Sequence, residues 1–458
     1  MNPEHRDPGM KVIALVDGEH YPSVTRWGLD SARAAGLDVI LALVVGGIEK
    51  LGADRSLHLG SVPVVRGEAD PRRALAAAIT EHTPEGVLDL SDEPVLGYER
   101  RMELVAVALS KGLTYLGADF RFEPPIVEAP LPVATLGVIG AGKRVAKTAI
   151  AGHTARLAVA AGLRPVIVAM GRGGPPAPVG AGPADVTLEA LLARADAGEH
   201  AASDYLEDAL TSGVPTIGAR RCGGGLAGRP FVTNVAEAAQ QAASSGADLV
   251  ILEGSGAAVP TVPWDAGVLV APATIPLDHL GGYFGPLRIL LSDLLVFIMD
   301  GGSSAEPDNL SSLYPLVRRL RADIRVAIAE LQPVPLADVR GKDAFFATTA
   351  HRELAGHLAD QLERTSGCRV VKVSPHLADR AALEADLAAA PAFDVLLTEL
   401  KAAAIDVAAR RALDRGAEVV FVDNRPRTAG GEGEIDELLT ETIQLAGDRG
   451  RERTQSGA

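Results

Sequence analysis

Short apolar runs alternate with alanine-rich stretches along almost the whole chain. The apolar runs are rich in β-branched residues and bounded by Gly or Pro, as buried strands are, while the alanine-rich stretches favour helices. A strand-helix alternation of this kind is typical of parallel sheets joined by crossover helices. We therefore expect an α/β, multi-domain protein with mostly parallel sheets and flanking helices.

The first third of the chain predicts one such unit. A strand at 11–17 precedes a helix at 21–35, and a second helix is expected at 100–110. Further strands are predicted at 38–45, 62–66, 86–90 and 114–117. Residues 122–132 are rich in proline, which helices and central strands tolerate poorly, so we interpret them as a linker. An N-terminal Rossmann-like domain is expected at 10–125.

The central third repeats the pattern. A β-branched strand at 133–139 runs into glycines, and a strong helix follows at 147–161. Strands are predicted at 165–170, 248–252, 267–271, 294–299 and 324–330. Helices are predicted at 188–194 and 204–212. The Gly- and Pro-rich residues 171–183 are expected to form a loop. These elements predict a phosphate-loop NTPase-like domain at 131–335.

The last third, expected to be an α/β domain at 340–448, alternates again but carries no motif. Strands are predicted at 344–348, 369–373, 394–397 and 418–422. A regulatory, substrate-capping or dimerising role is equally open for it. The tail after Gly447 is polar, so we expect it to be disordered.

The clearest chemical signal is Gly140-Ala141-Gly142-Lys143-Arg144-Val145-Ala146-Lys147-Thr148. It follows a predicted strand and opens a predicted helix, which is the context that a phosphate-binding loop requires. Backbone N–H groups at the helix N-terminus would bind the phosphate chain of a nucleotide. Lys147 would reach the outer phosphates, and the Thr148 hydroxyl would ligate Mg²⁺. Ala141 and Ala146 occupy the two glycine positions of the standard pattern, which alanine can fill where φ is negative.

A second signal is the strand 248–252, which ends in Glu253-Gly254-Ser255-Gly256. An acid at the carboxyl end of a parallel strand faces the crevice in which such sheets bind ligands. Glu253 is therefore a candidate to hold Mg²⁺, directly or through water, or to orient an attacking group. With Lys147 and Lys143, it completes our set of candidate catalytic residues.

Composition narrows the partners. The formal net charge of −15 argues against nucleic acid and anionic membranes, which bind positive surfaces, but leaves room for a local basic pocket. Cys222 and Cys368 are the only cysteines, too few for a disulfide framework or a zinc cage. Residues 1–10 are polar, and the apolar run 289–299 is too short to span a bilayer. We expect a cytosolic protein, with 289–299 forming a helix end and a buried strand.

The chain resembles the cyclic 2,3-diphosphoglycerate synthetase family and, more distantly, dethiobiotin synthetase. The resemblance rests on Val16-Asp-Gly-Glu-His-Tyr-Pro22, the Gly140–Thr148 loop and Glu253–Gly256. Lys143 lies four residues before Lys147, whereas the signature lysine of related dimeric ATPases lies five before. A homodimer is one expectation from those relatives. The family loop more often has glycine at the position of Ala146.

The resemblance implies that ATP phosphorylates 2,3-bisphosphoglycerate and that its neighbouring phosphate then closes a ring, releasing inorganic phosphate. Because this substrate carries several negative charges, the protein needs cationic groups to bind it. The candidate substrate-binding residues lie at predicted strand ends or beside glycines: Asp17, His20, Arg172, Arg220 and Arg221. Two other readings stay open, an ATP-dependent ligase of the dethiobiotin synthetase type and a nucleotide-dependent regulatory NTPase.

Three weaker features complete the analysis. Cys222 has no evident His partner and is interpreted as a small buried residue rather than a nucleophile. His153, on the helix after the phosphate loop, is expected to be a packing or surface residue. Residues 301–304, Gly-Gly-Ser-Ser, are either a second loop near the crevice or a connector.

Overall fold

The computed structural model describes residues 8–48, 57–299 and 306–456. The chain forms two compact units. Unit 1 comprises Met1–Val127 and Leu277–Leu291, and unit 2 comprises Glu128–Pro276 and Ser292–Ala458. The change from unit 1 to unit 2 falls inside the proline-rich segment at 122–132. Residues 301–304, singled out above, lie outside the described residues.

Unit 1 is a sheet covered by helices. Among the described residues its strand order is β3-β2-β1-β4-β5-β6, parallel except for β6. The strands are β1 (Lys11–Val16), β2 (Asp38–Val44), β3 (Val64–Arg66), β4 (Gly86–Asp89), β5 (Thr114–Leu116) and β6 (Arg121–Phe122). The helices are α1 (Pro22–Ala34), α2 (Pro71–His82), α3 (Tyr98–Ser110), α8 (Leu277–Gly281) and α9 (Gly285–Leu290). The order in which strands are added to the sheet reverses between β1 and β4, and open parallel sheets bind ligands at such a switch point.

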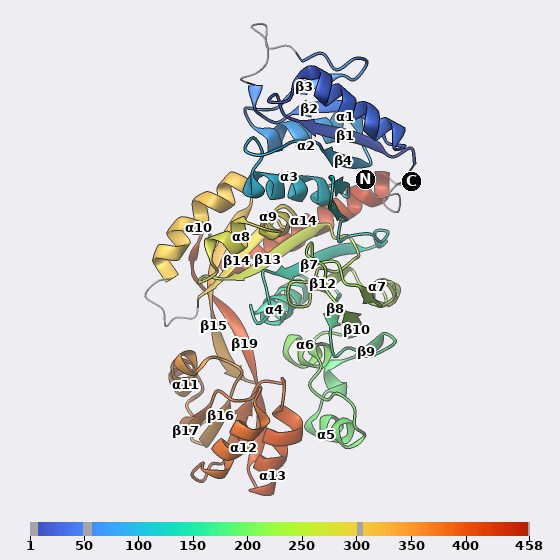
Figure 1. Cartoon of the computed structure of the whole chain (residues 1–458). Helices are drawn as coiled ribbons and strands as arrows, with labels where there is room; N and C mark the ends of the chain where they lie inside the picture. Colours follow the sequence, from blue (N-terminus) through green and yellow to red (C-terminus); the bar gives the residue numbers. More distant parts are fainter. Residues whose placement is uncertain (1–7, 49–56, 300–305, 457–458) are drawn as a thin grey trace. The chain divides into compact units, whose positions relative to one another are not determined.

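Unit 2 is built on one long sheet of order β11-β10-β8-β12-β7-β13-β14-β15-β19-β18-β16-β17, with β9 paired to β10 (Figure 1). Its first strands are β7 (Ala134–Gly140), β8 (Pro165–Gly171), β9 (Val179–Ala181), β10 (Thr216–Cys222), β11 (Val232–Thr233), β12 (Leu249–Glu253) and β13 (Ala266–Pro272). The others are β14 (Leu294–Met299), β15 (Arg325–Pro335), β16 (Asp343–Ala347), β17 (Arg369–Ser374), β18 (Val395–Thr398) and β19 (Glu418–Gly431). Strands β15 and β19 pair antiparallel and join two parallel parts of the sheet.

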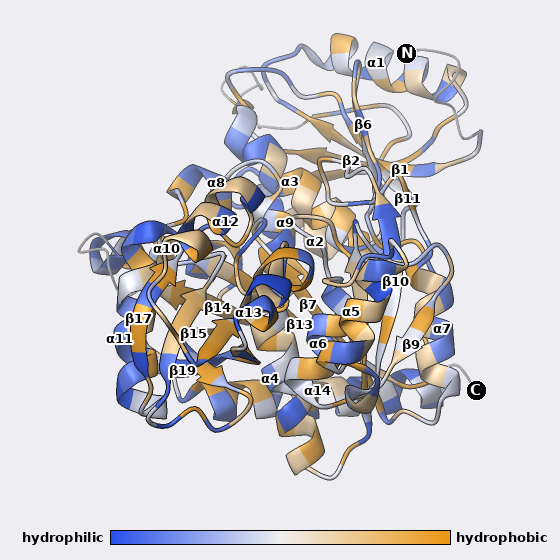
Figure 2. Cartoon of the chain, turned by 90° about the horizontal axis from the view of Figure 1, so that it is seen from below, coloured by the Kyte–Doolittle hydropathy of each residue, from blue (hydrophilic) through white to orange (hydrophobic). Residues whose placement is uncertain are grey.

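The helices of unit 2 lie between these strands in the sequence, except α14, which follows the last described strand, β19. They are α4 (Lys147–Ala160), α5 (Leu188–Asp196), α6 (Asp204–Ser212), α7 (Val235–Ser244), α10 (Glu306–Leu320), α11 (Arg352–Ser366), α12 (Arg380–Ala388), α13 (Arg410–Asp414) and α14 (Ile435–Ser456). A short 3₁₀ turn, η3 (Pro183–Asp185), and a π-helical turn, η4 (Ala404–Ala409), complete the set. In Figure 2 the strands β13, β14 and β15 are largely apolar, as expected for strands covered on both faces.

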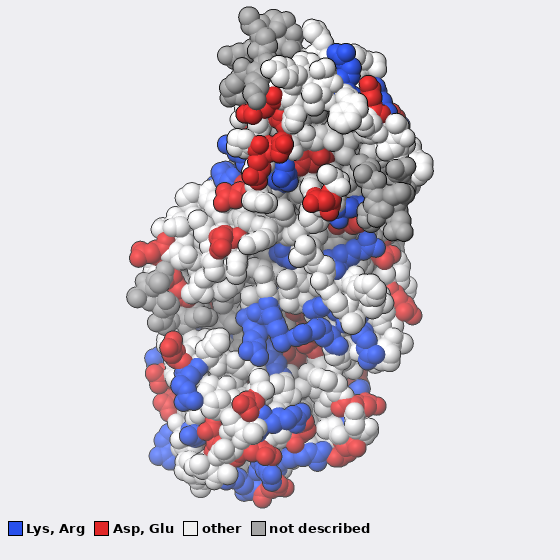
Figure 3. Space-filling view, in the orientation of Figure 1, with Lys and Arg blue, Asp and Glu red and all other residues white. Residues whose placement is uncertain are grey.

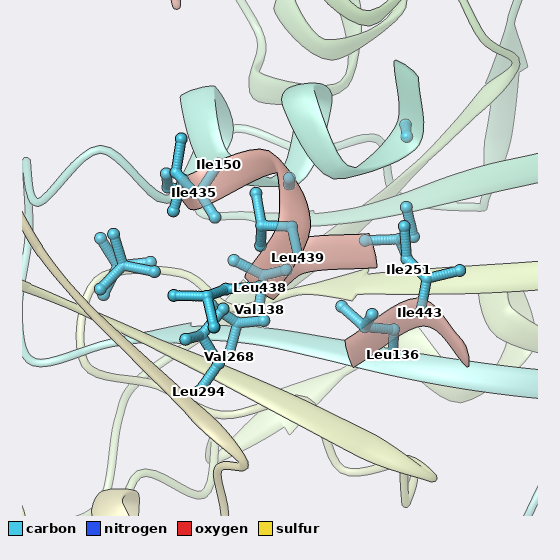
Figure 4. Close-up of a cluster of buried hydrophobic side chains, with 14 of the residues drawn as sticks. Leu136, Val138, Ile150, Ile251, Val268, Leu294, Ile435, Leu438, Leu439 and Ile443 are labelled. Carbon is cyan, nitrogen blue, oxygen red and sulfur yellow. The ribbon is translucent and has the colours of Figure 1, made fainter. Parts of the chain in front are cut away.

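The core beneath the phosphate loop is completed by the last helix of the chain. On α14, Ile435, Leu438, Leu439 and Ile443 recur at helical spacing and pack with residues of β7, β12 and β13 (Figure 4). The prediction of a disordered tail after Gly447 is therefore wrong, since α14 continues to Ser456. Arg453 ties this end down by donating to Asp265 and to the carbonyls of Leu131 and Val133.

The fold class predicted from the sequence is confirmed, as is the strand-loop-helix at the phosphate loop. The apolar run at 289–299 is the end of α9 followed by β14, as predicted. The loop expected at 171–183 contains the short strand β9, because its residues pair with the edge of β10. Strand β10 itself was not predicted, since Arg220 and Arg221 interrupt its apolar pattern.

Candidate functional site

The phosphate loop connects the central strand β7 to α4. Strand β7 ends at Gly140, and α4 begins at Lys147. A Cβ at Gly140 would lie 2.8 Å from Val145 Cγ2 and 2.9 Å from Lys147 Cδ, so a side chain there would displace the side chains of Val145 and Lys147. The amide of Ala141 donates to the carbonyl of Val270 on β13, 2.9 Å away. The loop is thus held tightly at its entry, at the carboxyl end of a central parallel strand.

Two non-glycine residues of the loop have left-handed backbone conformations. Arg144 has φ of 60° and Ala146 has φ of 68°. We expected alanine to be tolerated where φ is negative, and at Ala146 that condition is not met. A non-glycine residue in this region costs about 1–3 kcal/mol. Ala146 therefore stores backbone strain at the N-cap of α4.

Replacing Ala146 by glycine is expected to relieve this strain. Part of the gain is offset because glycine loses more backbone entropy on folding. The net effect should be a rise of about 1 kcal/mol in the free energy of unfolding. Denaturant unfolding of the two proteins measures it. As a matched control, Ala141→Gly should destabilise, because Ala141 is not among the residues with positive φ. Lower stability for Ala146→Gly would contradict the assignment of strain.

Lys147 is folded back over the loop. Its side chain is buried, and its Nζ donates to the carbonyl of Gly142, 3.0 Å away. Burial lowers the pKa of Lys147, while the carboxylates of Glu253 and Asp204 act in the opposite direction. Burial has removed most of the water around the Lys147 ammonium, and the Gly142 carbonyl accepts a hydrogen bond in its place. A nucleotide phosphate arriving in the loop would supply the missing negative charge.

Thr148 and Glu253 meet beside Lys147. The Thr148 hydroxyl donates to Glu253 Oε1 at 2.8 Å, and Glu253 is only 5% exposed at the end of β12. Strand β12 lies between β7 and β8, with Glu253 in register with Val138 on β7. The sheet order therefore brings together the two residues that the sequence proposed as magnesium ligands.

A second carboxyl group, that of Asp208 on α6, lies beside this pair. Asp208 is fully buried, and within the described part of the chain neither of its oxygens, nor Glu253 Oε2, has a conventional hydrogen-bond donor. Burial, together with the charge of Glu253, raises the pKa of Asp208 well above its ordinary value. Burial likewise raises the pKa of Glu253, while the hydrogen bond from the Thr148 hydroxyl opposes the rise. The pair is satisfied only when a proton or a cation lies between the two carboxyls.

Oxygen donors of this kind suit Mg²⁺, a hard cation that prefers carboxylates and hydroxyls. No group of three or more His, Cys, Asp or Glu side chains in the described ranges is arranged to hold a metal by itself. Such a sparse protein ligand set is usual for Mg²⁺, which keeps waters and takes the remaining oxygens from nucleotide phosphates.

Helix α6 turns one acidic face toward the site. Asp204, Glu207 and Asp208 are spaced three and four residues apart and so share that face. Glu207 Oε1 accepts a salt bridge from Lys401 Nζ at 2.9 Å. Burial raises the pKa of Glu207 to about 7, although Lys401 acts to lower it. Lys401 follows β18 and is therefore far from α6 in the sequence.

The predicted arginines surround the loops next to α6. Arg220 Nε donates to the carbonyl of Gly174, and Arg221 donates to the carbonyls of Gly223 and Ser255. Gly174 approaches the backbone of β10 closely: a Cβ there would lie 2.0 Å from Ala219 O. Arg172 is exposed. In Figure 3 Lys and Arg gather over the region of α4, α6 and β10.

Asp17 and His20 lie in unit 1, at the carboxyl end of β1. Asp17 is 1% exposed, and its carboxylate accepts from the amides of Glu19, His20 and Asp92. His20 Nδ1 lies 2.8 Å from Asp17 Oδ1, which fixes the orientation of the imidazole ring. Asp17 is thus fully engaged inside unit 1, whereas the His20 side chain is 37% exposed.

Two other expectations have outcomes. Cys222 is exposed rather than buried, because β10 carries it to the rim beyond the sheet interior. His153 is a packing residue: its Nε2 lies 2.6 Å from Asp436 Oδ1 on α14. A cavity of about 930 Å³ includes His153, Gln332 and Arg427 in its lining but none of the phosphate-loop residues.

Sequence reasoning missed Asp204, Glu207, Asp208 and Lys401. A signal for the acids was present: three acids at helical spacing interrupt the apolar helix predicted at 204–212. Lys401 follows the predicted strand 394–397, and the carboxyl ends of parallel strands face ligands. Its pairing with α6 could not be inferred, because it depends on the antiparallel β15–β19 junction.

A phosphate loop between a central strand and a helix, with a Thr–Glu pair at the tip of the adjacent strand, defines a phosphate-loop nucleotide-binding enzyme. Family models agree in detail. Those of cyclic 2,3-diphosphoglycerate synthetase match in three parts: the N-terminal domain at 11–123, the P-loop domain at 135–329 and the C-terminal domain at 335–425. The chain belongs to the cyclic 2,3-diphosphoglycerate synthetase family.

Named relatives support this membership over nearly full length. The chain is 42% identical to the cyclic 2,3-diphosphoglycerate synthetase of Rubrobacter xylanophilus over 96% of this chain and 100% of that protein. It is 39% identical to the enzyme of the same name from Methanothermus fervidus, over 96% and 98% of the two chains. No helix among the described residues combines the length and apolar character needed to cross a bilayer.

Proposed function

We propose that this enzyme uses ATP to convert 2,3-bisphosphoglycerate into cyclic 2,3-diphosphoglycerate, ADP and inorganic phosphate. The γ-phosphoryl group of ATP passes to one phosphate of the acceptor, forming a P–O–P link. An oxygen of the neighbouring phosphate then attacks the inner phosphorus of that link. The ring P–O–P bond forms, and the outer phosphate leaves as inorganic phosphate.

The observation that carries the proposal is the cluster of Lys147, Thr148 and Glu253 around the phosphate loop, in a chain whose relatives carry that enzyme's name. The loop residues Gly140–Thr148 would hold the nucleotide phosphates through backbone N–H groups. Lys147 would leave the carbonyl of Gly142 and neutralise the β- and γ-phosphates. Lys143, exposed on the same loop, is proposed as a further charge near the transferred group.

Thr148 and Glu253 would hold Mg²⁺, with Asp208 as an additional oxygen donor. The unsatisfied oxygens of Asp208 and Glu253 support this assignment. When bound, the ion neutralises charge that develops on the phosphates. Of the chain's own groups, Glu253 orients the Thr148 hydroxyl, and Asp208 holds the proton that must leave when a cation enters.

The acceptor needs cationic groups that hold its two phosphates together. Arg172, Arg220 and Arg221 are proposed for this task, and Arg221 has a buried Nε that no described acceptor satisfies. Holding two mutually repelling phosphates in one place turns ring closure into an oriented intramolecular step, with effective molarities on the order of 10⁵ M. In unit 1, His20 oriented by Asp17 is proposed to add a contact to the substrate.

We further propose three functional parts, with boundaries near 10–125, 131–335 and 340–448, and a homodimer as the working assembly. The related dimeric ATPases motivate the homodimer. Size-exclusion chromatography with light scattering would give the mass of the particle.

Incubation of the protein with Mg-ATP and a panel of phosphoglycerates, followed by phosphorus NMR, tests the reaction. We expect a cyclic pyrophosphate signal only with 2,3-bisphosphoglycerate, with equal amounts of ADP and inorganic phosphate. If no ring product forms, but a dicarboxylate or a diamine stimulates ATP hydrolysis, the ligase reading replaces this one. Replacing Mg²⁺ by EDTA should abolish the signal.

A further inference from the structure

Family membership leaves the C-terminal residues 335–425, here called the C-terminal segment, without a chemical task. Within unit 2 this segment packs against the phosphate-loop part of the sheet. Leu400 and Ile405 are buried in one apolar cluster with Tyr205 and Leu206 of α6. At the surface, Arg410 forms a salt bridge of 2.5 Å with Asp196 on α5. The segment therefore has a packed and specific contact with the helix that carries Asp208.

That contact places Lys401 at the nucleotide site. Lys401 directly follows the buried Leu400, and its ammonium pairs with Glu207, the residue before Asp208. Helix α6 itself packs on α4, β8 and β10. A continuous series of neighbouring side chains thus leads from Thr148 through Glu253 and Asp208 to the face of α6 that Lys401 contacts.

Lys401 is held from its own side as well. Glu399, two residues before it, is buried and accepts hydrogen bonds from Thr349 and Asn424. Thr349 and Glu399 lie just past the carboxyl ends of β16 and β18, and Asn424 lies within β19, beyond the residues that pair with β18. The order in which strands are added to the sheet reverses between β16 and β18, and open parallel sheets bind ligands at such a switch point. The backbone just before Lys401 is therefore held in place by the hydrogen bonds of Glu399.

Cations from three parts of the sequence converge here. The carboxylate of Asp204 interacts electrostatically with Lys147, Arg221 and Lys401. Asp204 is exposed on the first turn of α6, so this end of the helix is open to a ligand. Lys401 also keeps part of its side chain, 37%, accessible to solvent. A ligand with several negative charges would satisfy all three cations together.

We propose that Lys401 binds a phosphate of the acceptor and exchanges Glu207 for it when the acceptor enters. The inference rests on the proposed function and gives the C-terminal segment a task within it. The segment supplies its own cation, Lys401, to the face of α6 that carries Glu207. Lys401 thereby helps to bring the acceptor next to the nucleotide held by Lys147.

Steady-state kinetics of the full-length enzyme test the proposal. Lys401→Met should raise KM for 2,3-bisphosphoglycerate on the order of 10–100-fold, as for loss of a charge-assisted hydrogen bond. The dissociation constant of ATP, from calorimetry, should stay within about threefold of wild type. Lys401→Arg should restore part of the loss, because the positive charge is kept.

Lys372→Met is the matched control. Lys372 lies on the edge strand β17, is 38% exposed and is also paired with a carboxylate, Asp386, at 3.9 Å. Its replacement should leave KM unchanged. An equal rise of KM in this variant would show that loss of any such lysine disturbs the segment, and the proposal would be wrong.

The variant Glu207→Gln distinguishes two roles of Lys401: binding of the acceptor, and a structural salt bridge with Glu207 alone. If Lys401 only anchors the segment, breaking the pair from either side should raise KM alike. If Lys401 binds the acceptor, Glu207→Gln removes a competitor, so KM should fall or stay at the wild-type value. A wild-type enzyme that forms no ring product would overturn the proposed function and this inference together. An active wild type with an unchanged KM in Lys401→Met would overturn the role of Lys401 alone.

Discussion

Replacing Lys147 by alanine is expected to weaken Mg-ATP binding by about 2–4 kcal/mol, or roughly 30- to 1000-fold. The ammonium is buried and donates to a backbone carbonyl of its own loop. Its removal leaves the nucleotide phosphates facing a loop with backbone donors but no buried positive charge. The fold should persist, because the loop backbone is unchanged. Isothermal calorimetry of the wild type and the variant gives the difference directly.

Lys143→Ala is the comparison within the same loop. Lys143 is exposed, so its removal should weaken ATP binding by only about 0.2–1 kcal/mol. Equal ATP affinity in wild type and Lys147→Ala would mean that the nucleotide binds elsewhere. A loss in Lys143→Ala as large as in Lys147→Ala would instead make Lys143 a direct ligand.

Glu253→Gln should lower turnover on the order of 10²–10³-fold while changing ATP affinity much less. A neutral amide is a poor ligand for a hard cation, and it also leaves Asp208 without its carboxylate partner. Steady-state kinetics over a range of Mg²⁺ concentrations measure the effect. The variant should need more Mg²⁺ to reach its residual maximum rate.

Glu103→Gln provides a control of equal burial. Glu103 and Glu253 are each 5% exposed, but Glu103 pairs with Arg72 in unit 1. It should lower thermal stability without a selective loss of Mg²⁺-dependent turnover. Wild-type turnover in Glu253→Gln would reduce Glu253 to a partner that orients Thr148.

Local signals were sufficient for the phosphate loop and Glu253. The strand, the Lys147–Thr148 pair and the following helix are all continuous in sequence, and apolar periodicity locates such elements. Glu253 was singled out because an acid at the carboxyl end of a parallel strand faces the crevice in which such sheets bind ligands. In both cases one short segment carries the whole pattern.

Contacts between distant segments were out of reach. The loop pattern showed that Ala146 occupies a glycine position, but only the structure shows that its φ is positive. Lys401 and Glu207 are far apart in sequence and meet only because β19 returns along β15. The tail after Gly447 looked polar because α14 buries a single stripe of its surface, and the other faces are exposed.

The position of α14 has a consequence for how the protein is made. The core under the phosphate loop takes Leu438, Leu439 and Ile443 from the end of the chain, although the loop itself is translated near residue 140. During synthesis, β7 and α4 leave the ribosome long before the helix that covers them. The core of the nucleotide site can therefore be completed only after α14 has been translated, and a chain terminated before α14 would expose an unfinished core to aggregation.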